Sequence, residues 1–371
     1  MRELLSDLRD WHTAGTPFAL ATVVAVRGSA PRAPGAVMAV SATGAVAGSV
    51  SGGCVESDVY EVAAEALSTG GTLLRTYGIS DDEAFGVGLT CGGTIEVLVR
   101  PYVEESDRAA LRELLGTIAA GEPVALATVV CGAAPAGVHR TVLAGRAAGS
   151  LGDEGLDAAV TEDARGLLAQ GVTGTTRYGA HGERRMQDVT VFVQAYAPAP
   201  RMLVFGAIDH AAATARIGSF LGYRVTVCDA RPVFATRERF PTADEVVCAW
   251  PHTYLESTPV DARTVICVLT HDPKFDVPLL AAALRTPAAY IGVMGSRRTH
   301  ADRTARLREA GVGEAELARL ASPVGLDLGA RTPEETAVSI AAEIVQHRWG
   351  GTGRPLGELA GAIHHAREPG T

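Results

Sequence analysis

An internal repeat in the first 196 residues constrains the fold of this chain more than any other feature of its sequence. Three stretches recur in the same order: PFALATVV (17–24) as PVALATVV (123–130), TLLRTYG (72–78) as TGTTRYG (173–179), and TIEVLVRPY (94–102) as VTVFVQAY (189–196). We therefore expect residues 1–196 to hold two copies of one unit, at about 1–102 and 103–196. Alternating and β-branched runs predict mostly strands, with helices near 55–68 and 104–120. Two such copies are expected to pack into one α+β domain, each covering the apolar face of the other.

A second domain is predicted beyond the Pro/Ala hinge APAPRM (197–202). Apolar strands then alternate with helices, which is typical of an α/β protein with a Rossmann-like, doubly wound sheet. The last helix, predicted over 333–349, has Thr332 as its N-cap and a proline at its first position. We place this domain at 197–350 and expect a flexible tail over 351–371.

Composition and charge exclude several classes of protein. The chain has 371 residues, a formal net charge of −9 and no long basic stripe, so we expect no nucleic-acid binding. The first residues do not resemble a signal peptide, and no apolar run approaches the roughly 18 residues of a membrane span. We therefore expect a cytoplasmic protein with no stable membrane insertion. Six cysteines without a CxxC pair argue against a structural zinc site and a disulfide framework. Cys228 and Cys267 lie in apolar strand-like runs and are expected to be buried core thiols.

Two of the other cysteines, Cys54 and Cys91, lie among glycines instead of apolar residues. The glycines beside them are Gly52, Gly53, Gly92 and Gly93. Where the first copy reads AGSVSGGCVES, the second continues AGS (148–150) with LGDEGLDA, and neither thiol has a counterpart there. Thiols needed by the fold should have counterparts in both copies, so this difference favours a functional site over a structural role.

The first strand–helix turn of the second domain departs from a dinucleotide-binding fingerprint. In VFGAIDH, Gly206 takes the first glycine position, but Ile208 takes the second, where only a glycine lets a pyrophosphate approach the backbone. Asp209 would cap the next helix and occupy the place of a phosphate. Asp229 ends the second strand, either as a ribose-binding acid or as a solvated strand-end residue. NAD(P) binding is therefore disfavoured.

A better candidate for anion binding lies further along, in YIGVMGSRRTH. A strand should pass into a helix there, so backbone N–H groups, a hydroxyl and guanidinium groups converge at the positive end of that helix. The residues concerned are Gly295, Ser296, Arg297 and Arg298. A capped helix with two solvated arginines is the alternative. His271, Asp272 and Asp327 also follow predicted strands and could line the same crevice, or form ordinary loop hydrogen bonds.

Several motifs together resemble the XdhC/CoxI family, whose members are accessory proteins in the maturation of molybdenum hydroxylases such as xanthine dehydrogenase and carbon monoxide dehydrogenase. The motifs are SGGCVE, LTCGG, GYRVTVCDAR, YIGVMGSRRT and PVGLDLGARTPEE. The resemblance implies a chaperone, more than a turnover enzyme, that binds molybdenum cofactor (molybdopterin), supports its sulfuration and delivers it to the apo-enzyme. It also implies a cysteine desulfurase as a partner, and a homodimer. The family turn GAGH is replaced here by Gly206-Ala207-Ile208-Asp209, which bears against dinucleotide binding.

The resemblance gives the two glycine-flanked thiols a role as ligands of molybdenum. Molybdenum in the cofactor is bound by dithiolene sulfur and accepts soft thiolate ligands, so Cys54 and Cys91 are the predicted metal ligands. Backbone N–H groups and the following helix should favour the thiolate of Cys54. Glu56 could anchor the amino group of the pterin, or cap that helix. The phosphate of the pterin would then suit the Gly295–Arg298 corner, if the two domains face each other across a cleft.

Two other functions stay open at this point. One is an NAD(P)-dependent oxidoreductase built on the second domain, against which Ile208 counts. The other is a thiol redox switch, in which Cys54 and Cys91 form a reversible disulfide. That would require their Cα atoms to lie within about 7 Å of each other.

Overall fold

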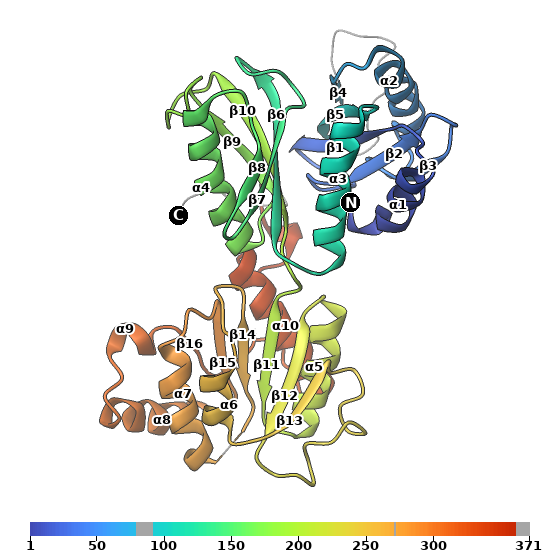
Figure 1. Ribbon diagram of the computed structural model, residues 1–371. Coiled ribbons are helices and arrows are strands. Elements are labelled where there is room, and N and C mark those ends of the chain that lie inside the picture. The colour runs from blue at the N-terminus through green and yellow to red at the C-terminus, as the bar shows by residue number, and fades with distance from the viewer. Residues whose placement is uncertain (79–91, 271, 361–371) are drawn as a thin grey trace. The chain divides into compact units, whose positions relative to one another are not determined.

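The computed structural model describes residues 1–78, 92–270 and 272–360 (Figure 1). The chain divides into two compact units, Met1–Pro198 and a second unit that begins at Ala199. No helix in the described ranges is both long enough and apolar enough to cross a membrane.

The first unit contains two five-stranded antiparallel sheets with the same strand order, β3-β2-β1-β5-β4 and β8-β7-β6-β10-β9. The first repeat comprises η1 (Arg2–Leu4), α1 (Leu5–Thr13), β1 (Phe18–Arg27), β2 (Val37–Ser41), β3 (Val46–Gly48), α2 (Glu56–Thr69), β4 (Leu73–Tyr77) and β5 (Thr94–Tyr102). The second comprises α3 (Glu105–Ala119), β6 (Val124–Gly132), β7 (His139–Leu143), β8 (Ala147–Gly149), α4 (Glu154–Gln170), β9 (Gly174–Tyr178) and β10 (Val189–Tyr196). A bulge interrupts both central strand pairs, at Val24 of β1 and at Val130 of β6. The shared order and the shared bulge confirm an α+β domain built by internal duplication.

Each sheet of the first unit is covered on one face by a helix of its own repeat. Val59 of α2 lies in the apolar cluster of the first sheet, and Val160 of α4 lies in that of the second. The inner faces of both sheets share a further cluster, which includes Leu98 of β5 and Phe192 of β10. Each copy therefore buries apolar surface of the other.

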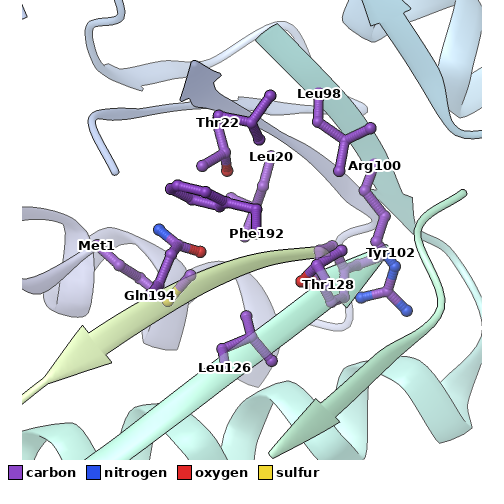
Figure 2. A pocket seen from close by; sticks show the side chains of 11 residues that line it. Met1, Leu20, Thr22, Leu98, Arg100, Tyr102, Leu126, Thr128, Phe192 and Gln194 are labelled. Atoms are coloured by element: carbon purple, nitrogen blue, oxygen red, sulfur yellow. The ribbon is translucent and has the colours of Figure 1, made fainter. Parts of the chain in front are cut away.

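A small cavity between these two sheets is lined by matching residues of both repeats (Figure 2). Thr22 of β1 lines it from one side and Thr128 of β6 from the other. Arg100 of β5 and Gln194 of β10 also line the cavity. They occupy equivalent positions of the two repeats, but only Arg100 is charged. Arg100 is turned toward Asp107, to which it donates a hydrogen bond of 2.8 Å. The duplication has thus placed equivalent positions of the two sheets opposite each other.

The second unit is a six-stranded parallel sheet in the order β13-β12-β11-β14-β15-β16. Its elements are β11 (Arg201–Phe205), α5 (Asp209–Phe220), β12 (Arg224–Asp229), β13 (Glu245–Cys248), α6 (Pro251–Ser257), β14 (Val265–Val268), α7 (Pro273–Leu284), β15 (Tyr290–Val293), α8 (Arg297–Glu309), α9 (Glu314–Leu317), β16 (Leu320–Ala321), α10 (Pro333–Trp349) and η2 (Leu356–Glu358). One apolar cluster joins the sheet to α5 and α10, and another joins its opposite face to α6, α7 and α8. This arrangement confirms the doubly wound, Rossmann-like fold. The chain order puts the topological switch point between β11 and β14, where ligands bind in such sheets.

Candidate functional site

The turn that carries Cys54 is open on its glycine side. Gly52 and Gly53 have φ of +80° and +121°, and a Cβ at either position would meet nothing within 4 Å among the residues that the structure describes. The two glycines are therefore required by the backbone conformation and not by crowding. Cys54 is half-buried and packs against the apolar cluster of the first sheet. Val55 is the N-cap residue of α2, so the thiol lies beside the positive end of that helix.

Glu56 holds this turn with its carboxylate. One oxygen, Oε1, accepts the backbone N–H groups of Val50 (3.1 Å), Ser51 (2.8 Å) and Gly52 (3.0 Å). Oε2 accepts the N–H of Gly53 at 2.8 Å. The hydroxyl groups of Ser49 and Ser51 donate to the two oxygens at 2.5 and 2.6 Å. Burial alone would raise the pKa of Glu56, but the serine and backbone donors outweigh it and lower the pKa to about 2.

The geometry of Glu56 bears on the two roles that the sequence left open. Both carboxylate oxygens of Glu56 accept hydrogen bonds from the turn. The N–H groups of the turn form a concave set of donors that can bind an anion, and here that anion is the carboxylate of Glu56. Ser51, only 1% exposed, also accepts the backbone N–H of Cys54 at 2.9 Å. Glu56 therefore fixes the backbone on which the thiol is carried.

The second repeat keeps the carboxylate but not the thiol. Asp157 takes the place of Glu56 and accepts the backbone N–H of Leu151 at 2.7 Å, as Glu56 does from Val50. Gly155 takes the place of Cys54. The duplicated fold therefore uses an acid at this position in both copies, whereas the thiol and its two glycines belong to the first copy alone.

Gly92 and Gly93, which follow Cys91, are glycines for two different structural reasons. Cys91 itself lies outside the described residues. Gly92 has a φ of +76°, and no other part of the described chain lies within 4 Å of the place a Cβ would take. A Cβ on Gly93 would lie 2.0 Å from the carbonyl oxygen of Ser29, so Gly93 permits a close approach of two backbones. The structure therefore does not test whether Cys54 and Cys91 lie together. Among the residues that the structure describes, no three His, Cys, Asp or Glu side chains gather into a metal site.

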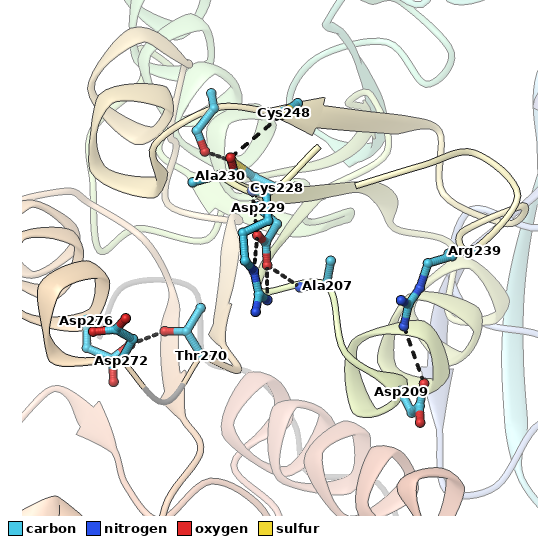
Figure 3. Close-up of polar contacts among 12 residues, drawn as sticks. Ala207, Asp209, Cys228, Asp229, Ala230, Arg239, Cys248, Thr270, Asp272 and Asp276 are labelled. Atoms are coloured by element: carbon cyan, nitrogen blue, oxygen red, sulfur yellow. Dashed lines mark hydrogen bonds and ion pairs between the residues drawn. The ribbon is translucent and has the colours of Figure 1, made fainter. Parts of the chain in front are cut away.

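The carboxylate of Asp229, at the end of β12, is hydrogen-bonded to other groups of the protein (Figure 3). It is 3% exposed, and it accepts the backbone N–H of Ala207 at 2.7 Å. Arg231 donates from Nε at 2.9 Å and from Nη2 at 2.8 Å, one bond to each carboxylate oxygen. Burial would raise the pKa of Asp229, but these bonds lower it. Asp209, at the start of α5, forms an ion pair of 3.6 Å with Arg239. Asp229 is therefore buried and paired, whereas Asp209 is exposed, and the N-cap residue of α5 is Ile208 and not Asp209 as the sequence predicted.

The other predicted residues of the second unit do not form one cluster. Asp272 is the N-cap of α7 and accepts the N–H of Lys274 at 3.1 Å. Asp327 is exposed, and no hydrogen bond or ion pair joins it to Asp272 in the described part of the chain. His271 lies outside the described residues. Ser296 caps α8 by accepting the N–H of Thr299 at 3.1 Å.

Comparisons with known proteins agree with this architecture. A family model described as the XdhC Rossmann domain matches residues 202–344, within the second unit. A model described as the XdhC and CoxI family matches residues 11–78 and 117–179, one segment in each repeat. The chain belongs to the XdhC and CoxI family.

Relatives of this XdhC and CoxI family member match along nearly its whole length. A Bacillus subtilis protein, named as a probable subunit of xanthine dehydrogenase, is 32% identical over 331 residues, 89% of this chain and 92% of the relative. The Escherichia coli protein named molybdenum cofactor insertion chaperone PaoD is 26% identical over 335 residues, 90% of this chain and 85% of PaoD. A crystal structure from Bacillus halodurans, described as a xanthine dehydrogenase, has a TM-score of 0.64 at 26% identity, over 92% of this chain and 95% of that one.

Two buried charged residues of this XdhC-family chain were missed by sequence reasoning. Asp276 of α7 and Arg303 of α8 are 3% and 4% exposed and form an ion pair of 3.0 Å. The hydroxyl of Thr270, after β14, donates to the same carboxylate. A sequence signal exists, since Arg303 lies one helical turn before Leu307 and so shares the buried face of α8.

Proposed function

We propose that this protein binds molybdenum cofactor as its cargo, supports replacement of an oxo ligand by sulfur, and delivers the cofactor to an apo molybdenum hydroxylase. The family membership and the PaoD likeness support cofactor handling as the general role. The observation that carries the proposal to particular residues is the Cys54 turn. Its backbone is fixed by Glu56, no described residue crowds the Cβ positions of its two glycines, and the second repeat has no thiol at the equivalent position.

Thiolate chemistry explains why such a turn suits this cargo. Molybdenum in the cofactor is already bound by sulfur, and a further soft ligand is supplied by a cysteine thiolate. The thiol lies beside the positive end of α2. The backbone N–H groups of the turn itself donate to Glu56 and Ser51, so they fix the backbone that carries the thiol. Because no atom of the described residues lies within 4 Å of a Cβ placed on Gly52 or Gly53, we propose that a bulky group approaches the thiol from that side. Cys91 is proposed as a second thiol ligand or sulfur carrier.

The residues proposed for the rest of the cargo lie in the second unit. The phosphate of the pterin is assigned to the α8 corner, formed by Gly295, Ser296, Arg297 and Arg298. A cysteine desulfurase is the proposed source of sulfur, a xanthine or carbon monoxide dehydrogenase the proposed recipient, and a homodimer the proposed assembly.

Delivery is tested by reconstitution of an apo molybdenum hydroxylase. The protein is incubated with freshly released cofactor, gel-filtered, and mixed with apo xanthine dehydrogenase, whose activity is then followed. We expect activation above that given by the same amount of free cofactor, and a loss of at least tenfold in Cys54→Ala. The matched control is Cys131→Ala, which removes an exposed thiol of the same unit. Equal activation by wild type and Cys54→Ala would remove the thiol from the proposal.

A further inference from the structure

The helix α8 begins at the carboxyl end of β15 with donors that are not used by the protein. Ser296 accepts the N–H of Thr299 and so caps the helix. Arg297 and Arg298, in the first turn, are exposed and make no hydrogen bond or ion pair with any residue that the structure describes. A capped helix with two exposed arginines is common and would not by itself mark a binding site.

A buried guanidinium beneath this turn is the second observation. Arg303 is 4% exposed, and its Nη2 donates to Asp276 and to the carbonyl oxygen of Met294, both at 3.0 Å. Its other terminal nitrogen, Nη1, is buried and has no hydrogen-bond partner within the described residues. A buried N–H of a charged group without an acceptor is costly, and native structures rarely leave one in that state.

The position of Nη1 shows which part of the turn it faces. It lies 3.5 Å from the point that a Cβ on Gly295 would occupy, and Thr299 lies 3.3 Å from the same point. Because residue 295 is a glycine, it places no side chain of its own between Nη1 and the start of α8, and the side chain of Thr299 is the other neighbour. The missing acceptor of Arg303 and the positive end of the helix therefore both face the volume around Gly295.

The charges around this volume favour an anion. The carboxylate of Asp276 is occupied by Arg303 and by the hydroxyl of Thr270. Asp272, also at this edge of the sheet, is paired with Lys274 at 3.3 Å. The charged side chains in the first turn of α8 that pair with no described residue are Arg297 and Arg298, and both are cationic.

We propose that the Gly295–Arg303 corner binds a phosphate monoester, with Arg303 Nη1 as its buried donor and the α8 N-terminus and its exposed arginines as the remaining donors. An oxygen of the phosphate supplies the acceptor that Nη1 lacks, in a charge-assisted hydrogen bond. The proposal deepens the proposed function and rests on it for the identity of the natural ligand, because the pterin of molybdenum cofactor carries such a phosphate. The phosphate site itself requires no molybdenum.

The test uses inorganic phosphate as the probe and the full-length protein, with calorimetric titration at constant ionic strength. Arg303→Lys keeps a cation next to Asp276, so the buried pair survives, but it removes the second terminal nitrogen. We expect saturable binding in wild type that is at least tenfold weaker in Arg303→Lys. Arg306→Lys, an exposed change on the same helix, should bind like wild type. Absence of saturable binding in wild type, or equal binding in Arg303→Lys, would overturn the inference.

A second measurement covers the case in which Arg303→Lys is misfolded. Arg297→Gln and Arg298→Gln together remove two exposed cations without touching the core, and they should also weaken phosphate binding. Unchanged binding in this double variant would contradict the proposed placement at the start of α8. Since inorganic phosphate is the probe, loss of cofactor retention in Cys54→Ala leaves this outcome unaffected, and the two proposals fail separately.

Discussion

The carboxylate of Glu56 should contribute measurably to the stability of the first unit, and Glu56→Gln tests this. The side chain accepts hydrogen bonds from five backbone N–H groups and two hydroxyls, and its pKa is lowered from 4.5 to about 2. A shift of that size corresponds to roughly 3 kcal/mol. Since Glu56 is only half-buried, solvent screening reduces this to roughly 1–2 kcal/mol. Glutamine keeps the size of the side chain but loses the charge and one acceptor oxygen.

The pH dependence of this effect has a defined sign. A carboxyl group whose pKa is lower in the folded state stabilises the fold fully above its unfolded pKa, near 4.5, and loses that contribution as the pH falls toward 2. Wild type and Glu56→Gln should therefore differ by a constant amount above about pH 5 and converge below pH 4.5.

Hydrogen exchange in rising urea, read on peptides from residues 1–198, measures unfolding of this unit separately. The control is Glu61→Gln, an exposed glutamate on the same helix, which should change the unfolding free energy by less than about 0.5 kcal/mol. Equal stability of Glu56→Gln and Glu61→Gln at pH 7 would refute the role assigned to the carboxylate.

Two further predictions concern backbone and burial in the same unit. Gly93→Ala should lower the free energy of unfolding by more than about 3 kcal/mol, because its Cβ would lie 2.0 Å from the carbonyl oxygen of Ser29. Gly52→Ala, with no described atom nearby but a φ of +80°, should lower it by about 1 kcal/mol. Thermal unfolding compares the two variants, and equal losses would contradict these backbone roles. Burial, and after it the charge of Arg100, lowers the pKa of His139 to about 4. The unfolded chain then binds a proton more readily than the folded one, so the free energy of unfolding should fall as the pH drops from 6.5 toward 4. His139→Gln should flatten that slope, and an unchanged slope would show that His139 does not titrate in this way.

The sequence predicted the architecture well because repetition and periodicity are local signals. The three recurring stretches predicted two copies of one unit, and the chain forms the same strand order twice. The helix predicted over 333–349 coincides with α10, since Thr332 and Pro333 define its start. Helices predicted near 55–68 and 104–120 correspond to α2 and α3, each displaced by about one residue at its start.

Partners of buried polar groups could not be predicted in the same way, because they depend on which side chains meet in space. The sequence left Glu56 between two roles, and only the backbone of the turn shows that both its oxygens are occupied. The sequence placed Asp229 at the end of a strand, but its pairing with Arg231 depends on the conformation of the loop that follows. Arg303 was missed because its buried contact with Asp276 joins two different helices, which a local sequence pattern does not show.

Retention of molybdenum cofactor shows directly whether Cys54 binds the cargo. Wild-type protein, Cys54→Ala and Cys131→Ala are each incubated with freshly released cofactor and gel-filtered, and the retained pterin is oxidised to its fluorescent product and counted per chain. The account predicts near-stoichiometric pterin on wild type and on Cys131→Ala, and a loss of at least tenfold on Cys54→Ala, with all three proteins equally folded. Retention by Cys54→Ala equal to that of wild type, or no retention by wild type, would contradict it.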